Sequence, residues 1–195
     1  MLKYTFIVPA VLFSLLISLL TAVCGQNVLI VYYSVQGHTA AMAEAVAEGA
    51  RSVSGAAVKL LPVDKATYSD VLAAEAIILG SPVHNANVAP PIQQFINSWP
   101  IAGQPLKDKI GAAFVTGGGI SAGEELTQLN LLHTMLIFNM IVVGGPTWQQ
   151  AFGASGITGE APFNDEQVEG LVQPQFLAKG EALGKRVAEL AGRLK

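Results

Sequence analysis

Hydrophobic residues gather along the chain in short unbroken runs, and longer amphipathic segments separate these runs. A short run rich in Val and Ile predicts a strand that is buried on both faces, as in a parallel sheet. Runs of this kind lie at 28–33, 76–79, 110–115 and 140–143. Segment 57–61 instead alternates around a central lysine, which is typical of an edge strand.

Between these runs, apolar residues recur at the spacing of a helix. The segments with this spacing are 40–51, 69–76, a segment that starts at Pro90, 124–138 and 176–194. Strand and helix thus alternate along the whole chain. This pattern predicts an α/β fold, with a five-stranded doubly wound parallel sheet and helices on both faces. Segment 144–173 is rich in turn residues and predicts a long loop.

Two of the predicted helices allow their buried faces to be named. In the 124–138 helix, His133 falls on the stripe of Leu126, Leu129 and Leu136. We therefore expect it to be a core or boundary histidine. In the last helix, the residues expected to point inward are Phe176, Leu183, Val187, Leu190 and Leu194.

The first 25 residues differ from the rest of the chain. Lys3 is their only charge, residues 4–23 are almost wholly apolar, and small residues lead up to Gly25. This order predicts a secretory signal peptide over 1–25, cleaved near Gly25–Gln26. The protein would then be secreted or periplasmic, and one domain would occupy 26–195.

Two alternatives keep the N-terminal segment on the protein. The apolar run approaches the roughly 20 residues that span a bilayer, so the segment could remain as a membrane anchor. Residues 21–24, Thr-Ala-Val-Cys, also loosely resemble a bacterial lipobox, which would attach a lipid to Cys24. Only in these cases do we expect the protein to associate with a membrane.

Composition narrows the range of functions. The chain has 195 residues and a formal charge of −3, which becomes −4 if the segment containing Lys3 is removed. It contains no basic block, so we expect no nucleic-acid partner. Cys24 is the single cysteine, and the three histidines lack the spacing of a metal cluster. We therefore expect no metal site.

The loop at 34–39 is the first candidate for chemistry. It reads Ser-Val-Gln-Gly-His-Thr and joins the first predicted strand to the first predicted helix. Hydroxyls and free helix N–H groups then meet at the carboxyl end of a central strand, where open α/β sheets bind ligands and where phosphate is favoured. The loop lacks both the lysine-bearing P-loop and the G-x-G-x-x-G motif, so a single terminal phosphate suits it best. The alternative is an ordinary polar turn.

Two further loops follow inner strands, and together the three resemble the flavodoxin-like family. The likeness is strongest to its WrbA-type branch of NAD(P)H:quinone oxidoreductases and FMN reductases. Residues 33–38 match the Y-S-x-x-G-H of that branch, and residues 80–82 match its G-[ST]-P. Residues 116–119 resemble its T-G-x-G-G, and a similar helix start follows them. The resemblance runs from about Val28 to the C-terminus and implies the strand order 2-1-3-4-5.

The resemblance also implies a cofactor and its contacts. FMN would place its phosphate in the first loop and its isoalloxazine ring between the second and third loops. NAD(P)H would be the co-substrate, a quinone or similar small molecule the acceptor, and the assembly a homo-dimer or homo-tetramer. The residues placed at FMN in this way are Ser34, Val35, Gln36, Gly37, His38 and Thr39, then Pro82, Val83, His84 and Asn85, and finally Thr116, Gly117, Gly118 and Gly119.

The second loop departs from the family pattern. Members of the branch carry an arginine and an aromatic residue where this chain has His84 and Asn85. If His84 takes the place of that arginine, it could protonate the departing acceptor or stabilise reduced flavin, which makes it the candidate catalytic residue. The alternative is a surface histidine without a partner.

These features leave three functions open. The first is an FMN enzyme that passes two electrons from NAD(P)H to a quinone. The second is an exported electron carrier of the flavodoxin type, because NAD(P)H is scarce outside the cytosol. The third is a flavodoxin-like domain that has lost its cofactor and binds another ligand.

Overall fold

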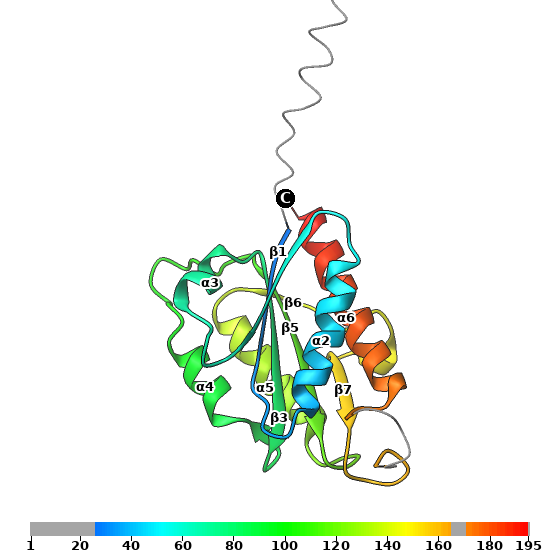
Figure 1. Cartoon of the computed structure of the whole chain (residues 1–195). Helices are drawn as coiled ribbons and strands as arrows, with labels where there is room; N and C mark the ends of the chain where they lie inside the picture. Colours follow the sequence, from blue (N-terminus) through cyan, green and yellow to red (C-terminus); the bar gives the residue numbers. More distant parts are fainter. Residues whose placement is uncertain (1–25, 165–170, 195) are drawn as a thin grey trace, which may run out of the picture.

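A twisted sheet forms the centre of the molecule, with α2 and α6 on one face and α3, α4 and α5 on the other (Figure 1). The computed structural model describes residues 26–164 and 171–194. The strands are β1 (Gln26–Tyr32), β2 (Ala56–Pro62), β3 (Ala76–His84), β4 (Asn87–Val88), β5 (Ile110–Gly117), β6 (Ile141–Val142) and β7 (Ala154–Ile157). The helices are α2 (His38–Arg51), α3 (Tyr68–Ala73), α4 (Pro90–Asn97), α5 (Glu124–Ile137) and α6 (Pro174–Arg193), with a 3-10 turn η1 (Trp148–Gln150).

The strand order confirms the predicted doubly wound topology. The main path of the sheet is β2-β1-β3-β5-β6, and all its pairs are parallel. The predicted number of five strands was wrong, because the sheet has seven strands within the described part of the chain. β4 pairs antiparallel with the end of β3, so the second predicted loop begins as a hairpin.

The fifth position of the sheet is shared by two short strands. β6 pairs with the first residues of β5, and β7 pairs with Phe114 to Gly117 at its far end. Between them the chain leaves the sheet at Gly144-Gly145-Pro146, and the Gly145 N–H bonds the carbonyl of Gln150 at 2.8 Å. A Cβ at residue 144 would lie 2.0 Å from the carbonyl oxygen of Ala151, so this reversal requires glycine.

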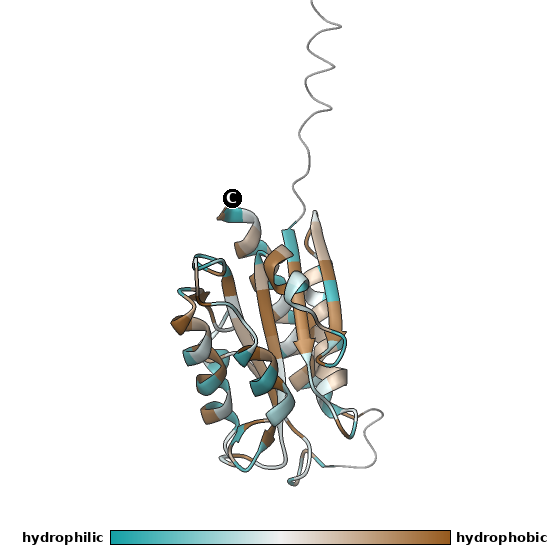
Figure 2. Cartoon of the chain, turned by 90° about the vertical axis from the view of Figure 1, so that its left-hand side faces the viewer, coloured by the Kyte–Doolittle hydropathy of each residue, from teal (hydrophilic) through white to brown (hydrophobic). Residues whose placement is uncertain are grey.

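Alternate residues of the inner strands face two separate cores. Val28 and Ile30 of β1 pack towards α2 and α6, whereas Leu29 and Val31 pack towards the other helices. This alternation explains why the inner strands read as continuous apolar runs in the sequence. Figure 2 shows the same pattern, with hydrophobic colour along the strands behind the helices.

The prediction that His133 is a core or boundary residue was wrong. His133 is exposed, as are Leu126 and Leu136 on the same stripe. Leu131 and Met135 pack against the sheet instead. Because α5 carries apolar residues on two faces, their spacing alone did not show which face is buried. In α6 the first three inward residues are buried as predicted, while Leu190 is half-buried and Leu194 is exposed.

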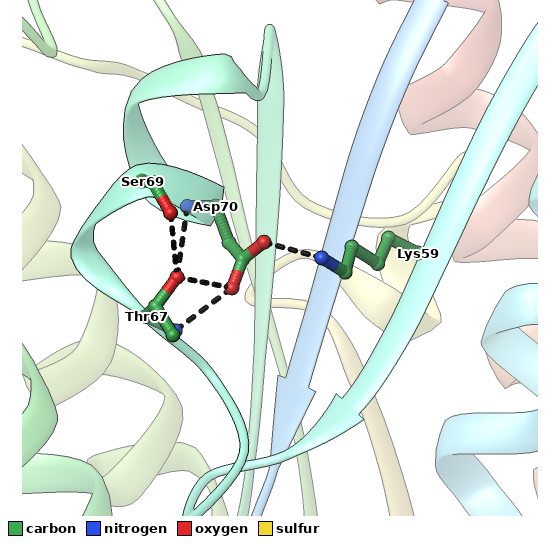
Figure 3. Close-up of polar contacts among 4 residues, drawn as sticks. All are labelled: Lys59, Thr67, Ser69 and Asp70. Atoms are coloured by element: carbon green, nitrogen blue, oxygen red, sulfur yellow. Dashed lines mark hydrogen bonds and ion pairs between the residues drawn. The ribbon is translucent and has the colours of Figure 1, made fainter.

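Helix α3 begins with a complete capping box (Figure 3). The Thr67 hydroxyl accepts from the Asp70 N–H, and the Asp70 carboxylate accepts from the Thr67 N–H. Asp70 also pairs with Lys59 of β2, which fastens the short helix to the edge strand. The hydrogen bond from Lys59, together with those from Thr67, lowers the pKa of Asp70 to about 2.

The predicted N-terminal signal segment, 1–25, lies outside the described residues and stays a prediction. Of the helices in the described part of the chain, none combines the length and the apolar character that crossing a bilayer requires.

Candidate functional site

One cavity opens at the carboxyl ends of β1, β3 and β5. Its volume is about 440 Å³, within the range of about 300–1,000 Å³ that ligand pockets occupy. Four segments contribute to its wall. The lining residues are Ser34, Val35, Gln36, His38, Thr39, Pro82, Val83, His84, Thr116, Gly117, Gly118 and Thr158.

The first loop presents a helix N-terminus to this cavity. Gly37 is the residue before α2, and its left-handed φ of 92° favours glycine. No side chain caps the helix, and no residue in the described ranges accepts the N–H groups of 38–40. The capping box of α3 satisfies its first turn from within (Figure 3), whereas α2 leaves its first turn free for a ligand. An unsatisfied helix start of this kind favours an anion.

The second loop is a tight hairpin that carries His84 at its tip. Ser81 is fully buried and accepts the N–H of Ala89 at 2.9 Å, which fixes the base of the hairpin. Asn85 and Ala86 both adopt positive φ, the conformation of a two-residue hairpin turn. His84 is exposed and meets the ring of Tyr33 edge-on at 6.3 Å.

His84 also lines a second hollow on the outer side of the hairpin. This hollow has a volume of about 470 Å³ and is lined mainly by uncharged polar residues. The lining residues are His84, Asn85, Asn87, Val88, Pro90, Gln93 and Gln94. The imidazole therefore stands between the main cavity and a neighbouring polar surface.

The third loop is open towards the cavity and held from behind. A Cβ at Gly118 would meet nothing within 4 Å, so the glycine leaves free space on the cavity wall. Behind the loop, the carboxylate of Glu160 accepts the N–H of Ile120 at 2.6 Å. Glu124 accepts the N–H of Ser121 at 2.9 Å. Two carboxylates from different elements thus fix the conformation of the glycine-rich loop.

A buried hydrogen bond joins the first loop to the third. The hydroxyl oxygens of Thr39 and Thr116 lie 2.7 Å apart, and the two residues are 2 % and 4 % exposed. They are 77 positions apart in the sequence. Because both residues also line the cavity, this bond sets the distance between the helix start and the glycine-rich loop.

The structure brings together most of the residues expected at FMN from the sequence. Three of them do not line the main cavity. The Gly37 Cα instead faces Leu171, Asn85 lines the outer hollow, and Gly119 faces Glu160. The sequence prediction missed Thr158, whose N–H and hydroxyl both bond the carbonyl of Gly117. Thr158 directly follows β7, so recognition of that short strand would have revealed it.

Comparison with known proteins decides the family. The model of the NADPH-dependent FMN reductase family matches residues 27–154. The chain belongs to this family.

Curated relatives of this FMN reductase-family chain match over most of its length. It is 33% identical to an NAD(P)H dehydrogenase (quinone) of Geotalea daltonii, over 87% of this chain and 98% of that protein. It is 34% identical to a flavodoxin of Aquifex aeolicus, over 84% and 85% of the two chains. Among solved structures, a WrbA-like flavodoxin from Agrobacterium tumefaciens has a TM-score of 0.72 at 23% identity, covering 88% of this chain and 100% of that chain.

The cavity fits FMN in charge and in shape. Its lining contains no Lys, Arg, Asp or Glu, so a phosphate there would be held by hydroxyls and by backbone N–H groups. The free first turn of α2 supplies such groups, and the hydroxyl of Ser34 lies beside them, accepting the Gly37 N–H at 3.2 Å. The open surface at Gly118 leaves room for a flat ring.

Proposed function

We propose that this member of the FMN reductase family is an FMN-dependent oxidoreductase that passes two electrons from NAD(P)H to a quinone or similar acceptor. The proposal rests on one observation. The uncapped start of α2 and the open glycine loop at Gly118 line the same cavity, which contains no Lys, Arg, Asp or Glu. The NAD(P)H dehydrogenase (quinone) relatives support the choice of donor and acceptor.

Each loop has a distinct task in this proposal. The first loop would bind the phosphate through the amides of α2, with Ser34 and Thr39 beside them. Val83 and Gly118 would lie against the flavin ring. Bound FMN accepts a hydride from a nicotinamide and releases electrons to an acceptor. His84, at the cavity mouth, would donate a proton to the departing acceptor.

Reconstitution tests the cofactor first. The purified chain should take up FMN, become yellow and bind riboflavin much more weakly, because riboflavin lacks the phosphate that α2 would hold. Equal affinity for FMN and riboflavin would contradict the proposed phosphate site. Failure to take up either flavin would favour a cofactor-free binding domain.

The second candidate is an electron carrier of the flavodoxin type. The similarity to a flavodoxin of Aquifex aeolicus favours it, as does the predicted export signal. Turnover separates the two candidates. A quinone reductase oxidises NAD(P)H continuously when a soluble quinone is present, whereas a carrier is reduced only by a partner protein.

Localisation and assembly belong to the same proposal. We expect cleavage near Gly25–Gln26 and a secreted or periplasmic mature protein, with retention as a membrane anchor or lipidation as the alternatives. Intact mass of material from the native host would identify the mature N-terminus. We also expect a homo-dimer or homo-tetramer, which light scattering of the FMN-loaded protein would test.

A further inference from the structure

The second half of α6 lies near the end of the sheet where β1 starts (Figure 1). A basic hollow is lined by residues of this half of α6. Its volume is about 440 Å³, and its wall comes from α6 and from Pro146, in the segment between β6 and β7. The charged residues of the wall are Lys185, Arg186, Glu189 and Arg193, which together carry a formal charge of +2. The main cavity, which is proposed to bind FMN, lies at the other end of the sheet, at the carboxyl ends of β1, β3 and β5.

The positive charges of this hollow are not neutralised by neighbouring side chains. Glu189 lies four positions from Lys185 and from Arg193, a spacing that allows ion pairs on a helix. Nevertheless, within the described ranges no ion pair joins these cations to a carboxylate. The Nε of Arg186 is buried and donates to no acceptor there. Leaving a guanidinium donor without an acceptor is costly, and an anion in the hollow that Arg186 lines would interact favourably with its charge.

Ordinary helix chemistry accounts for only part of this arrangement. Arg193 lies in the last turn of α6, where a cation interacts favourably with the helix dipole. That effect falls off within one turn, so it does not explain Lys185 and Arg186, about two turns earlier. A solvated charged face accounts for the exposed Lys185, but not for the half-buried Arg186, whose Nε has no acceptor in the described residues.

We propose that this hollow binds a phosphate group. Arginine presents a planar fork of donors that matches phosphate oxygens, and the two flanking cations would complete the charge. The phosphate could come from a soluble ester or from a phospholipid head group. Retention of the apolar segment before Gln26, the alternative to cleavage, would favour the second source, because the side chain of Gln26, the first residue of β1, lies against Gly192 of α6.

Calorimetric titration of the full chain with inorganic phosphate tests the site. The protein is first loaded with FMN and then freed of unbound FMN, so that the flavin cavity is filled and no free phosphate ester competes. Ionic strength is held constant with chloride. We expect binding that Arg186→Gln weakens by roughly tenfold, that Lys185→Gln with Arg193→Gln abolishes, and that Arg186→Lys partly restores. The matched control is Lys65→Gln, which removes a surface cation outside the hollow and should change nothing.

Vesicle flotation separates the two sources of phosphate. The full chain and its Arg186→Gln variant are mixed with phosphatidylcholine vesicles that contain or lack phosphatidylglycerol. Binding that requires phosphatidylglycerol and falls several-fold in the variant assigns a lipid head group. Phosphate binding in the titration without such lipid binding assigns a soluble ester. No binding of either probe, or binding that survives both the Arg186 variant and the double variant, would overturn the site. NAD(P)H oxidation is not involved, so this result is independent of the proposed redox function.

Discussion

The buried pair of hydroxyls between Thr39 and Thr116 allows a sharp test of how the site is built. The oxygens lie 2.7 Å apart, and both side chains are almost completely buried. Valine has nearly the same shape as threonine, so Thr39→Val and Thr116→Val each remove one hydroxyl and leave the other buried without a partner. An orphaned hydroxyl costs about 1–3 kcal/mol of unfolding free energy.

The double variant is predicted to be more stable than the sum of the single variants implies. Replacing both hydroxyls removes the pair without leaving an orphan, and such replacements can be nearly neutral. Urea unfolding of the FMN-free protein gives the four stabilities of the cycle. A coupling energy of about 1–2 kcal/mol is expected. Single variants that unfold like the wild type would refute the buried hydrogen bond.

The affinity for FMN gives a second test of the hydroxyl pair formed by Thr39 and Thr116. Only one hydroxyl of the pair can donate to the other, so the second hydrogen remains for the ligand. Thr39→Val should weaken FMN binding by about 1–3 kcal/mol and riboflavin binding much less, because a charged phosphate loses one donor. Thr134→Val is the matched control, since the Thr134 hydroxyl bonds within α5 and does not line the cavity. An equal loss for both flavins would place Thr39 away from the phosphate.

Three further outcomes are expected. Gly118→Val should abolish FMN uptake while leaving the unfolding free energy measured in urea within about 1 kcal/mol of the wild type, because the added side chain enters open cavity space rather than the core. His84→Gln should slow quinone-dependent flavin reoxidation while FMN affinity stays nearly unchanged, because glutamine cannot pass a proton to the acceptor. An unchanged reoxidation rate would show that His84 is a bystander. Asp70→Asn should cost about 1 kcal/mol at neutral pH, because solvent around the exposed Lys59 screens the pair. The lowered pKa of Asp70, about 2, means that this difference disappears as pH falls from about 4 to 2, which acid unfolding curves would show.

The hydrophobic pattern was sufficient to predict the inner strands, and the resemblance to the flavodoxin-like family supplied their order. Strands such as β1 and β5 are buried on both faces, so their apolar runs stand out whatever surrounds them. The two strands that were missed, β4 and β7, are short. β7 reads Ala-Ser-Gly-Ile and depends on pairing with the far end of β5, a contact that no local pattern encodes.

The part of the site formed by loops at the ends of the inner strands could be predicted from the sequence. The first and third loops follow inner strands, and their residues were therefore expected to meet. The bond between Thr39 and Thr116 was not predictable, because it depends on side-chain positions 77 residues apart. The exposure of His133 was misjudged for a related reason: α5 offers leucines on both sides, and only the packed sheet selects one.

Anaerobic stopped-flow spectroscopy of the FMN-loaded protein tests electron transfer from NAD(P)H to a quinone most directly. The first mixing step, with NADH or NADPH, should bleach the visible flavin absorbance without a partner protein. The second step, with a soluble quinone, should restore that absorbance, and Gly118→Val protein should show neither change. Flavin that remains oxidised in the presence of both nicotinamides, but is reduced by dithionite and then reoxidised by quinone, would contradict an NAD(P)H-dependent enzyme and favour a flavodoxin-type carrier.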